Sequence, residues 1–293
     1  MNFSPQEIRT RAELNAIISA KRQLGQSIGF VPTMGALHDG HLSLVRIAKQ
    51  KCDFVVTSIF VNPTQFAPGE DLETYPRTES DDLAKLAALR CDAVYLPSVD
   101  EMYPEGSVTN VRVEQLSDLL DGQHRPHFFY GVATVVARLF IHVQPDIAVF
   151  GEKDYQQLQI IRRMVRDLGF PIEVIGGVTH RDRDGLAQSS RNAYLSASER
   201  EKASAMSSAL HRAACRLRIG APLQSAVEEA RAHLVAAGFD QIDYVSAVDP
   251  NTLEDLTGQR LAAGFQGRLL AAAWLGRTRL IDNLGFVANA PAA

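Results

Sequence analysis

Two histidines three residues apart, His38 and His41, lie in a stretch of sequence that could bind a polyphosphate. The stretch Val31–His41 follows a short apolar run and precedes an amphipathic one, which predicts a strand, a tight turn and a helix. The N-terminus of such a helix attracts anions through its free N–H groups and its positive dipole end. Both imidazoles would lie on one side of the first helical turn, where they can donate hydrogen bonds to one ligand. Gly35 and Gly40 would let the backbone approach that ligand closely.

Two other roles for this histidine pair remain open from the sequence. Closely spaced imidazoles suit zinc, but zinc needs three or four protein ligands, and no Cys, Asp or Glu cluster with ligand spacing lies nearby. The side chains could also be ordinary surface histidines at the start of a helix, because the motif is short. The strand, turn and helix signals around the motif favour the phosphate site.

Two further polar clusters follow predicted strands. Asn62–Phe66 comes after the β-rich run 54–61, and Gly151–Gln157 comes after the buried run 147–150. Ligands bind outside the carboxyl ends of the strands in an open parallel sheet, so both clusters are expected on the same rim as the histidines. Their amide side chains suit recognition of hydroxyl and carboxylate groups, although turn formation or simple surface exposure would also explain them.

Lys153 adds a compact positive charge directly after a predicted buried strand. A lysine in this place can bridge phosphate oxygens, while a local ion pair with its acidic neighbours, Glu152 and Asp154, is the competing explanation. The chain contains neither a Gly-x-x-x-x-Gly-Lys-Ser/Thr sequence nor a Gly-x-Gly-x-x-Gly sequence, so neither a P-loop nor a dinucleotide site is indicated.

The segment 181–192 carries two hydroxyls followed by an arginine, Ser189-Ser190-Arg191. Asp184-Gly185 marks a turn before them. Such a segment could bind a triphosphate from the side opposite the histidines. A flexible linker between domains is the alternative.

Alternating apolar strands and amphipathic helices position these groups. The expected helices are one ending near Leu24, with capping-box sequences at Ser4–Glu7 and Thr10–Glu13, and those at 41–51, 80–90, 130–143 and 155–168. The expected strands are 27–33, 54–61, 93–96, 147–150 and 172–178. This alternation predicts a doubly wound, Rossmann-like α/β domain over residues 1–178, whose parallel sheet is covered on both faces.

The pattern changes after about residue 179. Two helices, at 196–217 and 223–237, precede three strands at 244–248, 269–274 and 279–282, of which the last two are joined at Gly276-Arg277. Residues 179–293 are therefore expected to form a smaller α+β domain.

Bulk properties exclude several classes of protein. The 293 residues suffice for one large or two ordinary domains, and a hydrophobic content of 46% with 22% charged residues is typical of a globular protein. A net charge of −4 argues against a nucleic-acid partner, and no apolar run is long enough to span a membrane. The N-terminus lacks the form of a signal peptide, and three widely spaced cysteines suit a reducing compartment, so a cytoplasmic location is expected.

The chain closely resembles the pantoate–β-alanine ligase (pantothenate synthetase) family, part of the nucleotidylyltransferase superfamily with HIGH- and KMSKS-like motifs. The resemblance extends in family order over nearly the whole chain. The matching blocks are Val31–His41, Phe60–Phe66, Glu70-Asp71, Tyr75–Thr78, Phe150–Gln157, Asp184–Ala187, Ser189–Leu195, Ala272–Gly276 and Arg279–Asn283.

This resemblance implies an enzyme that condenses (R)-pantoate with β-alanine at the expense of ATP. Pantoate would first form pantoyl adenylate with release of pyrophosphate, and β-alanine would then displace AMP. It implies Mg²⁺ as cofactor, small molecules as the only substrates, and a homodimer. Another HIGH-motif adenylyl-transferring enzyme, such as one that charges tRNA, and a catalytically silent nucleotide-binding protein are the alternatives.

Roles for individual residues are also carried over from the resemblance. The catalytic set that holds the phosphates would be His38, His41, Lys153, Ser189, Ser190 and Arg191. Pantoate would be bound by Gln65, Gln157 and Asn62, with Asn62 and Asp154 near the second substrate or the ribose. Further ATP contacts would come from Met34, Gly151, Asp154, His180 and Gln188, and Asp81 would help to seat Mg²⁺.

Some positions depart from the family pattern. Phe128 stands where the family has histidine, with His127 one residue earlier, and Gln188 stands where methionine is usual. His180 replaces a residue that is usually apolar. These departures are expected to affect the affinity for the nucleotide and the closure of the loop. They leave the main phosphate-binding set intact.

Overall fold

The strands assemble into two separate sheets in the computed structural model, which describes residues 3–289. The chain divides into two units, and the first consists of residues 3–118, 125–152 and 157–178. The second consists of residues 119–124, 153–156 and 179–289. The second unit thus contains, besides the residues after Val178, two short segments that the sequence-based division 1–178 and 179–293 places in the first domain.

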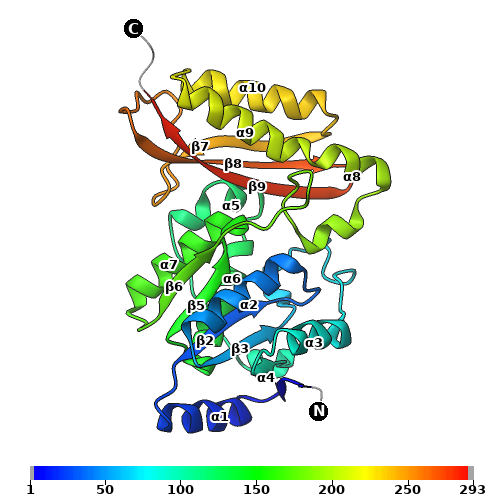
Figure 1. Ribbon diagram of the computed structural model, residues 1–293, viewed down its shortest axis with the longest axis vertical. Coiled ribbons are helices and arrows are strands. Elements are labelled where there is room, and N and C mark those ends of the chain that lie inside the picture. The colour runs from blue at the N-terminus through cyan, green and yellow to red at the C-terminus, as the bar shows by residue number, and fades with distance from the viewer. Residues whose placement is uncertain (1–2, 290–293) are drawn as a thin grey trace. The chain divides into compact units, whose positions relative to one another are not determined.

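A parallel sheet with the strand order β1-β4-β3-β2-β5-β6 forms the centre of the first unit (Figure 1). Its strands are β1 (Gln6–Ile8), β2 (Ile28–Thr33), β3 (Phe54–Ile59), β4 (Ala93–Tyr95), β5 (Ile147–Gly151) and β6 (Glu173–Gly177). From β2 the chain proceeds to β3 and β4 on one side and later returns to β5 and β6 on the other. The strand order therefore reverses between β2 and β5, which is where open α/β sheets bind ligands.

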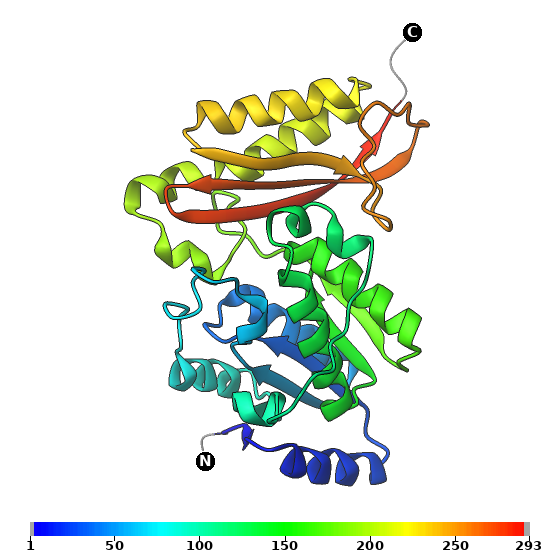
Figure 2. The same ribbon diagram turned by 180° about the vertical axis from the view of Figure 1, so that it is seen from behind.

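Helices cover both faces of this sheet (Figures 1 and 2). The helices of this part of the chain are α1 (Arg11–Gln23), α2 (Asp39–Lys51), α3 (Glu79–Ala88), α4 (Val99–Met102), α6 (Phe128–Val143) and α7 (Tyr155–Leu168). On one face, Val31 and Val94 share a buried cluster with residues of α2 and α3. On the other face, the ring of Phe140 in α6 contacts Phe30 and Phe150. Strands buried on both faces account for the unbroken apolar runs in the sequence, and the predicted fold class is confirmed.

The beginning of the chain differs from the prediction. Ser4–Glu7 resembles a capping box, but β1 lies there and pairs in parallel with β4, and Ile8 is buried. The second capping box is real: Thr10 accepts a hydrogen bond from the backbone N–H of Glu13, whose carboxylate accepts one from Thr10. Strand pairing with a segment more than 80 residues away overrides the local capping signal.

The second unit contains an antiparallel sheet with the order β7-β8-β9, formed by β7 (Gln241–Val248), β8 (Phe265–Leu275) and β9 (Thr278–Ala288). Its helices are α5 (Asp121–His124), α8 (Ala197–Ala203), α9 (Ala205–Arg218) and α10 (Leu223–Ala236). Leu269 and Leu280 belong to a core shared with α9 and α10, which lie along one face of the sheet (Figure 1). The predicted turn at Gly276-Arg277 joins β8 to β9, whereas the helix predicted at 196–217 is divided in two at Ser204.

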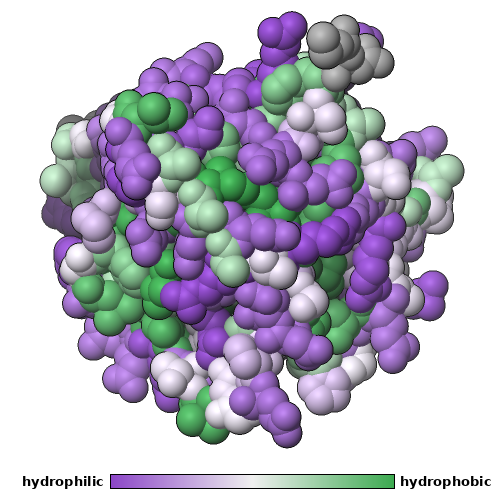
Figure 3. All heavy atoms as spheres, turned by 90° about the horizontal axis from the view of Figure 1, so that it is seen from below, coloured by the Kyte–Doolittle hydropathy of each residue, from purple (hydrophilic) through white to green (hydrophobic). Residues whose placement is uncertain are grey.

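No helix within residues 3–289 combines the length and the apolar character needed to cross a membrane. On the face shown in Figure 3, hydrophilic residues alternate with groups of apolar ones. Such a mixture is ordinary, because more than half of the accessible surface of a typical protein is contributed by apolar atoms.

Candidate active site

The two histidines of the opening motif lie side by side at the start of α2. His38 is the residue that precedes the helix, and its backbone N–H donates to Nδ1 of His41 over 3.4 Å. Their ring centroids are 4.1 Å apart, with an angle of 36° between the planes. Both imidazoles therefore belong to the end of the helix that attracts anions, as the sequence predicts.

The turn between β2 and α2 is held by a buried carboxylate, Asp82 in α3. Its two oxygens accept hydrogen bonds of 2.8 Å from the backbone N–H groups of Ala36 and Leu37. Ala36 has a φ of +48°, a conformation that residues other than glycine rarely adopt. Asp82 is fully buried, while Asp81, the predicted metal ligand, is exposed in the first turn of α3. The sequence contains two adjacent aspartates without indicating which of them is structural.

Asn62 is the centre of a buried amide cluster after β3. Its Oδ1 accepts hydrogen bonds from the hydroxyls of Thr64 (2.9 Å) and Tyr103 (2.8 Å), and burial raises the pKa of Tyr103. Its Nδ2 donates to Oε1 of Gln65 over 3.1 Å. The amide of Gln65 in turn donates to Sδ of Met34 over 2.9 Å. Three residues predicted to bind substrate or ATP are thus connected through Gln65, and Asn62 fixes the orientation of the Gln65 amide.

Close packing between α6 and the 3₁₀ turn η1 (Pro63–Gln65) holds this cluster in place. Nδ2 of Asn62 also donates to the backbone oxygen of Gly131 over 3.2 Å. A Cβ atom on Gly131 would lie 2.5 Å from the backbone oxygen of Thr64 and 2.7 Å from Cα of Gln65. Only glycine permits this approach, because backbone atoms cannot move aside as the end of a side chain can.

Replacement of Gly131 by alanine is therefore expected to displace Gln65. If Gln65 binds pantoate, as the family resemblance implies, the replacement should weaken pantoate binding. Overpacking of this kind costs about 1–3 kcal/mol. A loss of that size in pantoate binding corresponds to roughly a 5- to 150-fold rise in the KM for pantoate. Steady-state kinetics should show this rise with little change in the KM for ATP. Ala137→Gly is the control, since it weakens the same helix without pressing on η1. A pantoate KM within twofold of the original in Gly131→Ala would refute this role.

Lys153 lies in the short turn η3 (Glu152–Asp154) that follows β5. Its Nζ is 3.4 Å from Oδ1 of Asp154, so the local ion pair considered from the sequence is present. Gln157, predicted to bind pantoate, is half-buried near the start of α7. The neighbouring Gln156 is buried and structural: its side chain donates to the backbone oxygen of Leu119.

The segment 181–188 is a hairpin rather than a loose linker. Arg181 and Ala187 form an antiparallel bridge, and the N–H of Gln188 donates to the oxygen of His180 over 2.9 Å. Gly185 occupies the predicted turn with a φ of +91°. Ser189 then begins the 3₁₀ turn η4 (Ser190–Tyr194), and its hydroxyl accepts from the N–H of Arg191.

Arg200 of α8 fixes the acidic side chains of this hairpin. It pairs with Asp182 at 2.9 Å and with Asp184 at 2.5 Å. The hydrogen bond from Arg200 lowers the pKa of Asp184, so that side chain remains charged at a more acidic pH than an ordinary aspartate. No motif or spacing in the sequence indicates this role for Arg200.

The predicted site residues are distributed over both units. The first contains Met34, His38, His41, Asn62, Gln65, Asp81, Gly151 and Gln157. The second contains Lys153, Asp154, His180, Gln188, Ser189, Ser190 and Arg191. Phe128, which stands where the family has histidine, begins α6. The centroid of its ring lies 3.9 Å from the guanidinium of Arg125.

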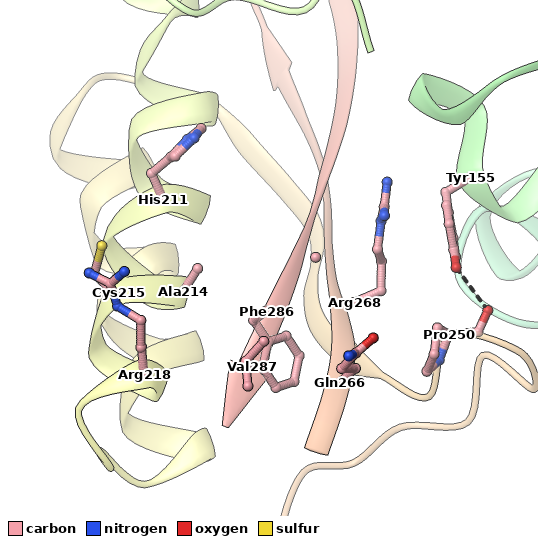
Figure 4. Close-up of a pocket in the computed structure, with 12 residues that line it drawn as sticks. Tyr155, His211, Ala214, Cys215, Arg218, Pro250, Gln266, Arg268, Phe286 and Val287 are labelled. Carbon is pink, nitrogen blue, oxygen red and sulfur yellow. Dashed lines mark hydrogen bonds between the residues drawn. The ribbon is translucent and has the colours of Figure 1, made fainter. Parts of the chain in front are cut away.

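A pocket of about 470 Å³ in the second unit does not coincide with this set (Figure 4). It lies between α9 and strands β8 and β9, and Tyr155, His211 and Arg268 are among the residues that line it. None of the residues predicted to bind ATP or pantoate lines this pocket.

Comparison with known proteins connects this arrangement to one family. The model of the family described as pantoate-beta-alanine ligase matches residues 6–285. The pantothenate synthetase of Hyphomonas neptunium is 67% identical over 278 residues, which are 94% of this chain and 95% of the relative.

Solved structures agree with the sequence relatives. The crystal structure of pantothenate synthetase from Thermus thermophilus has a TM-score of 0.89 and 48% identity, covering 95% of this chain and 98% of that one. The pantoate-beta-alanine ligase of Francisella tularensis, complexed with beta-gamma ATP and beta-alanine, has a TM-score of 0.77 and 33% identity, covering 96% and 97%. The chain described here belongs to the pantoate–β-alanine ligase family.

Proposed function

We propose that this enzyme joins pantoate to β-alanine in an ATP-dependent reaction that passes through pantoyl adenylate. Its relatives are pantothenate synthetases, and the family is described as pantoate-beta-alanine ligase, which supports pantoate as a substrate. The Francisella enzyme was crystallised with beta-gamma ATP and beta-alanine, which supports the other two substrates. The paired histidines at the N-terminus of α2, on a turn fixed by Asp82, are the observation that supports nucleotide binding most directly.

In the first step, the carboxylate of pantoate attacks the α-phosphorus of ATP and pyrophosphate leaves. The carboxylate is already ionised at neutral pH, so this attack needs no general base. It needs neutralisation of phosphate charge and in-line positioning of the reactants. His38, His41, Lys153, Ser189, Ser190 and Arg191 would supply the hydrogen-bond donors and positive charge. Gly151, His180 and Gln188 would add further contacts to ATP.

Pantoate would be held by amides rather than by charged groups. Gln65 is oriented by Asn62 and contacts Met34, so its position is fixed before substrate binds. Gln157 would provide the second amide, and Asn62 and Asp154 would lie near β-alanine or the ribose. A preorganised amide costs little ordering entropy when it binds the hydroxyl and carboxylate oxygens of a small acid.

Mg²⁺ fits Asp81 better than Asp82. Both oxygens of Asp82 already accept backbone N–H groups, whereas Asp81 is exposed in the preceding position. Magnesium in nucleotide enzymes is commonly held by one or two carboxylates together with substrate phosphates and water. When bound there, the ion would neutralise phosphate charge. No group of three or more His, Cys, Asp and Glu side chains that could hold a metal occurs in residues 3–289.

In the second step, the amine of β-alanine attacks the acyl carbon of the adenylate and AMP leaves. We propose that the domain 179–293, which carries Ser189–Arg191, closes over ATP and keeps water from the adenylate. The family resemblance favours a homodimer. We infer a cytoplasmic location from the sequence, and Cys52, Cys91 and Cys215 are free thiols, as expected in a reducing compartment.

Exchange of labelled pyrophosphate into ATP tests this function. We expect exchange to require pantoate and Mg²⁺ but not β-alanine, because the adenylate forms before the amine reacts. AMP should accumulate when β-alanine is added. Exchange that strictly requires β-alanine would exclude a separate adenylate step, and ADP with phosphate as products would indicate an acyl-phosphate ligase.

A further inference from the structure

Two adjacent residues of β9, Asp282 and Asn283, each contact a segment that we have placed in the ATP site. Both side chains are almost completely buried, with exposed fractions of 4% and 3%. Neighbouring residues in a strand point to opposite faces of the sheet, so the two side chains reach different segments. All the groups involved belong to the second unit.

Asn283 holds the backbone at Lys153. Its Nδ2 donates to the backbone oxygen of Lys153 over 2.8 Å. Its Oδ1 accepts from Nε and Nη2 of Arg268 at 2.8 and 2.5 Å, which fixes the amide with the nitrogen toward Lys153. The side chain of Asn283 therefore links Arg268 in β8 to the backbone of Lys153, the proposed catalytic cation.

Arg268 and Tyr155 complete this attachment. The guanidinium of Arg268 lies 4.0 Å from the centroid of the Tyr155 ring, and Figure 4 shows the two side chains next to each other. The hydroxyl of Tyr155 donates to the backbone oxygen of Pro250 over 3.1 Å, drawn as the dashed line in Figure 4. The segment from Lys153 to Tyr155 is thus attached at one end to β9 and at the other to the backbone at Pro250.

Asp282 holds the hairpin that leads to Ser189. Its carboxylate forms a bidentate ion pair with Arg181, with distances of 2.7 and 2.9 Å. Arg181 also donates to the backbone oxygen of Gly185 at the hairpin tip, and it forms the bridge to Ala187. The ion pair consequently fixes the hairpin that ends one residue before Ser189.

We propose that Asp282 and Asn283 are positioning residues that set the distance between Lys153 and the Ser189–Arg191 segment. Because the two residues are adjacent in one strand, the cation and the hydroxyls move as one body rather than as two independent loops. This inference rests on the proposed function, in which both segments hold the phosphates of ATP. Misplacement of a catalytic group by about 1 Å can reduce a rate by about a hundredfold, so a rigid spacing has a direct effect on catalysis.

The test is Asn283→Asp. The aspartate keeps an oxygen for Arg268 but replaces the amide donor with an acceptor facing the Lys153 oxygen. We expect pantoate-dependent pyrophosphate exchange to fall by about 10- to 100-fold, with the KM for pantoate within twofold of the original. Asn289→Asp makes the same substitution as a control: Nδ2 of Asn289 donates to the backbone oxygen of Arg218 in an exposed hydrogen bond that involves none of the site residues. It should leave the exchange rate unchanged.

A double variant separates positioning from general stability. If Asn283 acts through Lys153, then Asn283→Asp should lower the rate little further in the Lys153→Ala background. The proposal would be overturned if Asn283→Asp lowered the exchange rate by the same factor in the Lys153→Ala background as in the original protein. An unchanged exchange rate in Asn283→Asp alone would also overturn it. Asn283→Ser, whose hydroxyl is too short to reach Lys153, takes its place if the aspartate variant does not fold. Absence of exchange in the unmodified enzyme would instead refute the proposed function itself.

Discussion

Replacement of Lys153 by alanine is expected to lower the rate of adenylate formation by about 10²- to 10³-fold in a protein that remains folded. Loss of one contact to charge that develops in a transition state typically costs about 3–4 kcal/mol. Lys153 is the lysine that follows β5, the strand beside the reversal of strand order. Pre-steady-state or exchange measurements of pyrophosphate release report on this step directly.

The ion pair with Asp154 offers the competing explanation, and a second variant distinguishes the two. Asp154→Asn removes the partner at 3.4 Å but keeps the cation. If the pair were merely structural, both variants should lose similar, small amounts of stability, because pairs of this kind contribute about 0–1 kcal/mol. Neither variant should then lose activity. Near-normal turnover in Lys153→Ala would support that view. A large loss in Lys153→Ala together with a smaller one in Asp154→Asn would support the catalytic role.

Local sequence signals predicted the elements well where the spacing of apolar residues agrees with the turn and capping residues at the ends of the element. The helix at 223–237 and the turn at Gly276-Arg277 occur almost as expected. The close contact of His38 and His41 also follows from a spacing of three residues at a helix start. In each case the deciding interactions lie within one or two turns of the chain.

Contacts between distant residues could not be predicted in this way. Ser4–Glu7 has a helix-start pattern, yet its backbone pairs with β4. Arg279 forms ion pairs with Asp121 at 2.6 Å and Asp243 at 2.7 Å, which attach a segment from the middle of the chain to the C-terminal sheet. Burial alone would lower the pKa of Arg279, but these two carboxylates raise it. Nothing in the local pattern around any of the three residues indicates the partnership.

Distant contacts also explain why the division of the chain differs from the predicted boundaries. Residues 153–156 continue directly from β5, so their position in the sequence places them in the first domain. Their side chains and backbone instead bond to Asn283, Pro250 and Leu119. The proposed catalytic lysine therefore belongs to the unit that contains Ser189–Arg191.

The adjacent aspartates of α3 provide the second large expected effect, this time on stability as well as on activity. Asp82→Ala would remove the carboxylate that accepts from the N–H groups of Ala36 and Leu37. Loss of a partner for a buried group costs about 1–3 kcal/mol, so the free energy of unfolding should fall by about that amount for the buried N–H of Leu37, with a smaller addition for half-buried Ala36. The turn that carries His38 would also lose its anchor, so the KM for ATP should rise in the fraction that folds. Denaturant unfolding and ATP kinetics measure the two effects.

Asp81→Ala is the matched control, because it removes the same side chain one residue earlier from an exposed position. We expect it to unfold at the same denaturant concentration as the original protein, since surface substitutions usually change stability by less than about 0.5 kcal/mol. If Asp81 helps to hold magnesium, this variant should require a higher Mg²⁺ concentration for half-maximal exchange, and Asp82→Asn should not. Equal stability of Asp82→Ala and Asp81→Ala would contradict the structural role of Asp82. A magnesium requirement that changes with Asp82 rather than with Asp81 would reverse the assignment of the two carboxylates.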